Sequence, residues 1–364
     1  MTATKALGAF FCAKSRELFG VRSTRSQSQE HCPGQGGAQA NCRRSSLNAP
    51  LVRHTFLAVP IFAIALFATG LVDIPGRELR LLGIAPVDLS VVRVLTSGLL
   101  FLVCAAIRMI FCARPRIDRS GWRAILSFAL LGVVATNCGT TFSVSVLPAS
   151  TAVTTIFATS IATTLLFSDR TAARMTVDIC IGMMLVVLVA CLLGSNVADF
   201  KNIADPTVFA VPILTGIAQG LLYKVLGASD VEPFSFYGLS FAIGAVISLA
   251  VVLLAGLATP ESVVHAINAS VDEPGNLLLL AGAFTVVPYI AARLIARSLT
   301  MFAKGTASVG EPMGGVVSDM FNGHDIRFDQ AVVFCAVIVV VIAHQVYTHS
   351  RAFTGLGGNR RSSI

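Results

Sequence analysis

The sequence predicts an all-α integral membrane protein with ten transmembrane helices, arranged as two five-helix inverted repeats. Three observations lead to this prediction. Of the 364 residues, 55% are hydrophobic and only 13% are charged, about half the charged fraction of a typical soluble protein. The charged residues leave apolar windows that are long enough to cross a bilayer. Short sequences also recur in the two halves of the chain at a nearly constant spacing.

Ten windows have the length that a helix needs to cross ~30 Å of hydrocarbon. They are residues 55–73, 88–109, 123–144, 149–168, 176–195, 206–225, 234–257, 276–298, 304–322 and 330–348. Residues 147–150 (LPAS) separate the third window from the fourth, because proline ends a helix. The second window contains Arg93, and the ninth contains Glu311 and Asp319, so hydropathy alone scores these two windows low.

Two pairs of similar sequences indicate an internal duplication. Ala58-Val59-Pro60-Ile61 recurs 152 residues later as residues 210–213, and Ser150-Thr151-Ala152 aligns 155 residues later with residues 305–307 (GTA). Because each half would contain an odd number of spans, the second half enters the membrane from the opposite side. Many transporters use this inverted arrangement to expose one central site to either side. The predicted halves are residues 51–195 and 206–348.

The positive charge indicates orientation and does not predict nucleic-acid binding. The net charge of +8 comes mainly from the two tails and from the loops after the second and fourth spans. With both termini in the cytoplasm, most Lys and Arg residues lie on the cytoplasmic side, as the positive-inside rule requires. We therefore expect a bacterial-type inner membrane, a disordered basic cytoplasmic tail over residues 1–50 and a second cytoplasmic tail over residues 349–364. An organelle transit peptide is the alternative for residues 1–50.

The nine cysteines form neither a paired framework nor a Cys/His cluster of metal-ligand spacing. No phosphate-binding loop of the G-x-x-x-x-G-K-[ST] type is present in the sequence, so ATP is not expected to drive the protein. We expect no cofactor and no metal. The expected partners are a small-molecule substrate and the lipid bilayer, and a homodimer stays open.

Glu311 is the leading candidate for a functional residue. It lies about two turns inside the ninth predicted span and is followed by Pro312. An ionised group in hydrocarbon costs at least ~2.5 kcal/mol, so such residues usually face a cavity or a pathway. The side chain is too short to reach the membrane surface from ~10 Å inside a helix that rises 1.5 Å per residue. Its environment suits proton coupling or the binding of a cationic substrate.

Seven further polar residues inside the predicted spans are candidates for substrate or proton binding. They are Asn137, Thr140, Gln219, Tyr223, Tyr289, Arg293 and Arg93. Each of the pairs 137/140, 219/223 and 289/293 shares one face of a helix. The two arginines favour an anionic substrate, unless they only extend their charged ends toward the membrane surface. Two Gly-x-x-x-Gly sequences, at 216–220 and 310–314, indicate close helix packing.

The order of these features resembles the drug/metabolite transporter superfamily, in its EamA-type branch. The resemblance covers residues 55–348 and rests on residues 87–93 (VDLSVVR), 147–152 (LPASTA) and 303–307 (AKGTA), and on Glu311-Pro312. It departs at His324, where the family commonly has an acid. The resemblance implies ten helices, two inverted repeats and a central cavity. Members move amino acids, drugs, purines, nucleotide sugars and sugar phosphates, so the substrate does not follow.

We therefore expect a secondary transporter, a permease or exporter of a small organic metabolite or drug that works by alternating access with or without a coupled proton, and not an enzyme. An antiporter of phosphorylated metabolites, such as nucleotide sugars or sugar phosphates, is the alternative that the arginines favour. A membrane-embedded acyltransferase-like enzyme is another, because His324 and Asp329 have a His-x4-Asp spacing. A receptor-like protein would need neither a central acid nor a repeat. Asn268-Ala269-Ser270 is a glycosylation sequon that matters only in the secretory pathway.

Overall fold

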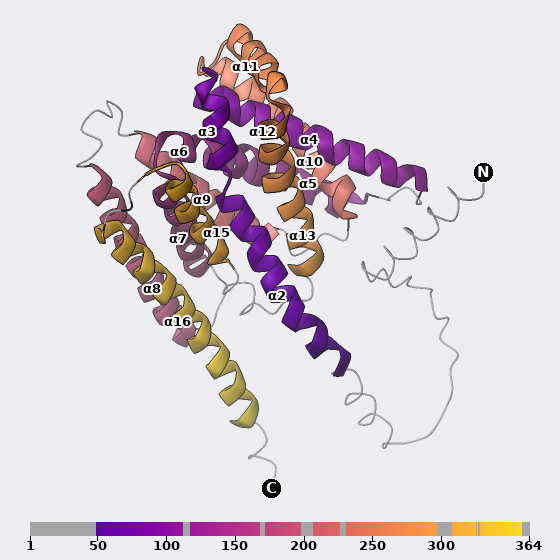
Figure 1. The fold of residues 1–364 in the computed structure, drawn as a ribbon. Coiled ribbons are helices and arrows are strands. Elements are labelled where there is room, and N and C mark those ends of the chain that lie inside the picture. Colours follow the sequence, from indigo (N-terminus) through magenta and orange to yellow (C-terminus); the bar gives the residue numbers. More distant parts are fainter. Residues whose placement is uncertain are drawn as a thin grey trace, which may run out of the picture.

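The computed structural model of the chain describes residues 49–111, 117–167, 172–197, 207–225, 231–296, 308–324, 326 and 328–358. Nearly all of these residues are helical, and the described ranges contain no strand (Figure 1). Residues 1–48 and 359–364 lie outside these ranges. Most of the predicted amino-terminal tail, for which a transit peptide was the alternative, therefore lies outside the described residues.

The helices follow the apolar windows of the sequence. In chain order they are α2 (Ala49–Gly70), α3 (Asp73–Leu81), α4 (Pro86–Phe111), α5 (Arg119–Ser127), η1 (Phe128–Cys138), α6 (Gly139–Val146), α7 (Ala149–Leu166), α8 (Ala172–Val197), α9 (Thr207–Val225), α10 (Pro233–Leu254), α11 (Pro260–Asp272), α12 (Pro274–Leu278), η3 (Leu279–Val286), α13 (Val287–Ala296), α15 (Gly310–Phe321) and α16 (Phe328–Gly358). Within the described residues, eight helical segments are long and apolar enough to cross a membrane. The chain is therefore an all-α, multi-pass membrane protein.

Two of the ten predicted spans are shorter than expected in the described residues. The sixth is α9, whose apolar part covers Val208–Leu222, and the ninth is α15. α15 begins at Gly310, after a turn at residues 308–309, and residues 297–307 lie outside the described ranges. The first span is longer than predicted and continues past Gly70 into α3.

The predicted break between the third and fourth spans is confirmed. Leu147 is extended, and Pro148 directly precedes α7 without a side chain that caps the helix. α6 and α7 are therefore separate helices joined by a connection of two residues.

Two segments, η1 and η3, have the wide turn of a π-helix. They lie in the third and the eighth predicted spans. Side chains in both segments donate hydrogen bonds to carbonyl groups five residues earlier: Asn137 to Gly132, Thr136 to Leu131 and Thr285 to Leu280. Segments of this kind are rare and often occur at functional sites.

Glycines allow two pairs of helices to pack closely. Gly216 and Gly220 of α9 lie against the backbone of α7, where an added methyl group would overlap the carbonyl oxygens of Ile156 and Ser160. Gly310 and Gly314 of α15 lie in the same way against α2. The predicted packing role of both Gly-x-x-x-Gly sequences is therefore confirmed.

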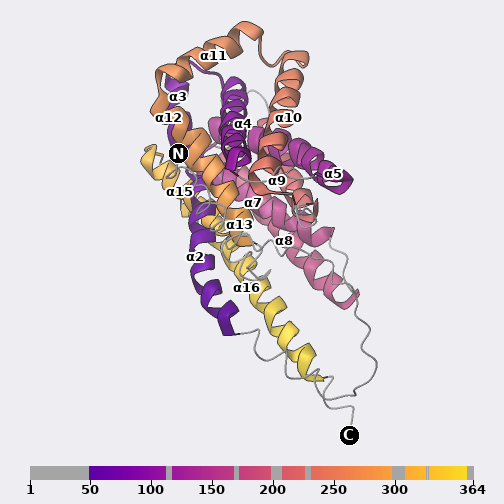
Figure 2. The same cartoon turned by 90° about the vertical axis from the view of Figure 1, so that its right-hand side faces the viewer.

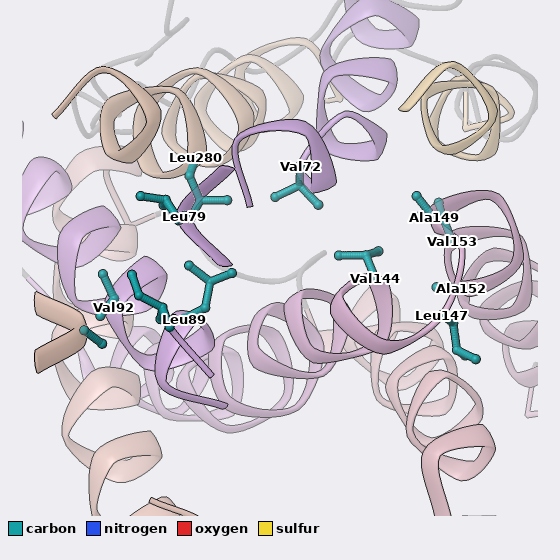
Figure 3. Close-up of a cluster of buried hydrophobic side chains, with 12 residues drawn as sticks. Val72, Leu79, Leu89, Val92, Val144, Leu147, Ala149, Ala152, Val153 and Leu280 are labelled. Carbon is teal, nitrogen blue, oxygen red and sulfur yellow. The ribbon is translucent and has the colours of Figure 1, made fainter. Parts of the chain in front are cut away.

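One end of the bundle, here called the α11 end, is formed by α3, α11 and the start of α12, whereas α2 begins and α16 ends at the opposite end (Figure 1). An apolar cluster lies at the α11 end. Figure 3 shows side chains of this cluster, which come mainly from α3, α4, α6, α7 and η3. Its members include Val72, Leu79, Leu89, Val92, Val144, Leu147, Ala149 and Leu280.

α11 was not predicted from the sequence, which indicated only a loop between the seventh and eighth spans. It runs across the α11 end, transverse to α10 (Figure 2). The sequon falls on this helix, where Asn268 is exposed but Ser270 is buried. The glycosylation acceptor sequence therefore lies on a folded helix, not on an open loop.

Candidate functional site

Arg93 is buried in the bundle and is held by hydroxyl groups. Only 3% of the residue is exposed. Its Nε donates to Thr285 Oγ1 over 3.0 Å, and its Nη1 donates to Thr141 Oγ1 over 2.8 Å. Each threonine hydroxyl donates its own proton to a carbonyl of its own helix, Thr141 to Asn137 and Thr285 to Leu280, and so presents a lone pair to the guanidinium. Arg93 therefore links α4 to α6 and η3 through neutral partners.

Asn137 connects the third and eighth predicted spans. Its Nδ2 donates to the hydroxyl of Tyr289 on α13 and to the carbonyl of Gly132, both over 2.8 Å. The Tyr289 ring packs edge-on against Phe128 and Phe241, with ring centroids 5.8 Å apart in each pair. Aromatic packing on one side and the Asn137 amide on the other fix the orientation of the phenol.

Glu311 lies in the first turn of α15 and is 8% exposed. The sequence predicts Glu311 about two turns inside the span 304–322, whose first residues, 304–307, lie outside the described ranges; the described helix itself begins one residue before Glu311. The first turn of a helix is a favourable position for a carboxylate, because the free N–H groups and the helix dipole are positive there. The carboxyl group is hydrogen-bonded to the Gln219 side chain on α9, and Arg93 is close enough to act on it electrostatically.

These contacts define a central polar cluster, composed of Arg93, Asn137, Thr141, Gln219, Thr285, Tyr289 and Glu311. It draws on α4, η1, α6, α9, η3, α13 and α15, so both predicted halves contribute. The cluster combines a cation, an acid, two amides, a phenol and two hydroxyl groups. Such a set can bind a small polar molecule or exchange a proton. No group of three metal-ligating side chains occurs among the described residues.

Three sequence-predicted site residues are not part of these contacts. Thr140 is buried, but Arg93 donates to Thr141 instead. Arg293 lies 4.2 Å from the ring centroid of Phe236 and donates to the Val231 carbonyl over 3.3 Å, so it is held among aromatic rings and does not extend to the membrane surface. The backbone of Tyr223 belongs to α9, but its side chain lies outside the described residues.

Thr141 and Thr285 are the site residues that sequence reasoning missed. Thr141 was visible only as one of many hydroxyl residues in its span. Thr285 is 192 residues from Arg93 and carries no pattern of its own. The prediction that residues 137 and 140 share one face was based on α-helical spacing, whereas Asn137 belongs to a π-helical segment.

A second set of polar residues, the terminal polar cluster, lies at the α11 end. Asp73 accepts from Arg80 over 2.9 Å and from Asn322 over 2.6 Å, and Arg77 donates to the Asn322 carbonyl. Asp319 accepts from the backbone N–H groups of Ala149 and Ser150, over 2.7 and 2.8 Å. These contacts tie α3 and α15 together and join α15 to the beginning of α7.

The apolar cluster separates the central polar cluster from the α11 end. Leu89 lies one turn before Arg93 on α4, and Val144 lies about one turn after Thr141 on α6. Because α4 and α6 run in opposite directions, both apolar side chains lie on the α11 side of the polar residues. The apolar cluster, whose side chains are drawn in Figure 3, and the terminal polar cluster therefore both lie on the α11 side of the central polar cluster.

A cavity of about 110 Å³ lies between α7, α8, α15 and α16, and it is lined in part by Ser150, Thr154 and Phe334. It shares no residue with the central polar cluster.

His324 and Asp329, the two residues of the His-x4-Asp spacing, lie on either side of the connection between α15 and α16. His324 is exposed in the turn after α15, and Asp329 belongs to the first turn of α16. Residues 325 and 327 between them lie outside the described ranges.

No family model matches the chain, and no curated protein matches it.

Proposed function

We propose that the protein is a secondary transporter of a small organic metabolite or drug, similar to the EamA-type permeases. The observation that carries this proposal is the central polar cluster. It places Arg93 and Glu311 within electrostatic range of each other inside a membrane bundle. Charged groups are costly at such depth and are usually kept where a substrate or ion must pass. The exposed position of His324 gives no support to the acyltransferase alternative, and we propose that the protein is not an enzyme.

We further propose ten spans in two inverted repeats. Three pairs of features support this arrangement. α7 packs along α9, and the counterparts of these helices in the other half, α15 and α2, also pack together. The π-helical segments lie in the third and eighth spans. Asn137 and Tyr289, which share a hydrogen bond, are 152 residues apart, the same separation as the two Ala-Val-Pro-Ile sequences.

Alternating access requires that the central site be closed on at least one side at a time. The apolar cluster and the terminal polar cluster support closure at the α11 end. The charge distribution of the sequence favours an orientation in which this end faces away from the cytoplasm and both termini are cytoplasmic. A bacterial-type inner membrane is the proposed location.

The chemistry of the central polar cluster suits a substrate that carries a positive and a negative group, or an uncharged polar substrate that moves with a proton. An antiporter of phosphorylated metabolites is the second candidate, and the neutral partners of Arg93 favour it, because they leave the charge of the guanidinium available to an anion. Arg293 gives this candidate less support, since its charged group lies over Phe236.

The test begins with a thermal-shift screen of the purified protein against amino acids, lipophilic amines, purines, nucleotide sugars and sugar phosphates. The compound that stabilises the protein is then used in uptake assays with proteoliposomes, with and without a pH gradient. We expect Glu311→Gln to insert and fold but to lose uptake. The matched control is Glu261→Gln, the same change at an exposed acid on α11, which should transport normally. Full uptake by Glu311→Gln, or the absence of any stabilising compound, would contradict the proposal.

A further inference from the structure

α11 has three distinct faces along its thirteen residues. At 100° per residue, the positions of one kind fall together in one sector of the helix. The buried sector contains Val263, Ala266 and Ser270. The next sector is apolar but exposed: Val264 is 55% exposed, Ile267 38% and Val271 61%. The third sector is polar and exposed, with Glu261, His265, Asn268 and Asp272.

The buried sector fixes how the other two sectors are presented. It packs on α4 and α12. The beginning of the helix is held by a capping box in which Thr259 and Ser262 bond to each other's backbone, and the Ser262 hydroxyl donates to Asp88 on α4 over 3.2 Å. The exposed apolar sector is therefore part of a rigid element.

The two segments that α11 connects also expose large apolar side chains near their junctions with it. Leu254, the last residue of α10, and Leu257, three residues after it, are strongly exposed, and so are Leu278 and Leu279 where α12 meets η3. Leu254, Leu278 and Leu279 belong to segments of spanning length, so we expect their exposed side chains to face lipid. α11 connects these two segments and lies transverse to α10 (Figure 2).

We propose that α11 lies in the membrane interface, with Val264, Ile267 and Val271 inserted at the boundary between acyl chains and head groups. Amphipathic helices bind in this plane through a buried apolar face. Many such helices also use Lys or Arg to attract anionic lipid, but Pro260–Asp272 contains neither and carries two acids. The partner is therefore the zwitterionic lipid surface, and insertion depends on apolar contact instead of charge attraction.

Tryptophan fluorescence tests this proposal directly. The chain has a single tryptophan, Trp122. The substitution Trp122→Phe removes it, so that a tryptophan added elsewhere is the only one in the protein. Ile267→Trp then reports on the apolar sector, and Asn268→Trp on the adjacent polar sector. In phosphatidylcholine vesicles whose lipids carry bromine on the shallow acyl carbons, we expect quenching to be several-fold stronger at position 267 than at position 268. Iodide in the buffer should give the reverse order.

Val271→Trp and Asp272→Trp form a second matched pair in case the first pair does not fold. Adding phosphatidylglycerol should leave the quenching by bromine unchanged. Equal quenching at both positions of a pair, or quenching that requires the anionic lipid, would overturn the proposal. If neither bromine nor iodide quenches the tryptophan at position 267, the proposal is also overturned, because this result would indicate contact with another protein chain.

Discussion

Asp319 and Glu311 lie on the same helix, α15, and are both buried, yet their partners differ in kind. Both carboxylate oxygens of Asp319 accept hydrogen bonds from backbone N–H groups at the beginning of α7. Glu311 is bonded to the Gln219 side chain and lies near the Arg93 side chain. Backbone groups at the end of a helix cannot turn away unless the helix moves, whereas side chains can rotate.

From this difference we expect a structural role for Asp319 and a functional role for Glu311. α7 has no capping side chain of its own, and Asp319 of another helix takes this role. Asp319 is therefore expected to hold α15 and α7 together. Glu311, which is bonded to a side chain, is expected to exchange its partner for a substrate or a proton more easily than Asp319. The following four substitutions test the comparison through the free energy of unfolding.

Asp319→Ala should have the largest effect and lower the free energy of unfolding by about 2–4 kcal/mol, because two backbone donors lose a charged acceptor. Chemical unfolding of the purified protein in detergent measures it. Asp319→Asn keeps one acceptor oxygen and should lose about half as much. If Asp319→Ala unfolds like the wild type, the capping role is wrong.

Arg93→Lys should rank second, with a loss of about 1–3 kcal/mol. An ammonium group lacks the planar fork that reaches Thr141 and Thr285 on two different helices. The same unfolding measurement applies, and Arg123→Lys, at an exposed position on α5, is the matched control. Equal stability of Arg93→Lys and the control would show that the hydroxyl contacts contribute little.

Tyr289→Phe should cost about 1 kcal/mol, because it removes a single acceptor from Asn137, which keeps its bond to Gly132. A double-mutant cycle with Asn137→Ala isolates the contribution of this bond. We expect a coupling energy close to the loss in the single variant. Strictly additive losses would mean that the two side chains do not interact in the membrane protein.

Glu311→Gln should have the smallest effect on stability, within about 0.5 kcal/mol, since the amide keeps the size of the side chain and can still bond to Gln219. Thermal unfolding monitored by circular dichroism provides the comparison with Asp319→Asn. A larger loss in Glu311→Gln than in Asp319→Asn would reverse the roles assigned to the two acids.

Features that depend on local sequence could be predicted, and features that depend on contacts between distant segments could not. Apolar windows located the long helices, Pro148 located the break before α7, and the Gly-x-x-x-Gly sequences indicated close packing. Hydropathy does not distinguish a π-helical turn from an α-helical one, so η1 was missed. The low overall hydropathy of α11 concealed its three faces.

The candidate site was predicted in part for the same reason. A buried acid is visible from the sequence, and Glu311 is buried in the central polar cluster. The partners of Arg93 come from two other helices, one of them 192 residues away, and no local pattern marks them. The position of Arg293 over Phe236 could not be predicted either, because Phe236 belongs to α10 and is far from Arg293 in the sequence.

The hydrogen bond between Asn137 and Tyr289 has a consequence for motion. If the two halves are repeats, these residues are each other's counterparts, and the bond joins equivalent positions. When the two halves exchange conformations, each contact is replaced by the contact between the equivalent residues of the other half. A contact between two counterparts is therefore kept, whereas the contact of Asp319 with Ala149 is replaced by a contact between two other residues. The Asn137–Tyr289 bond would then keep its length in both end states and lie at the pivot of the motion between them.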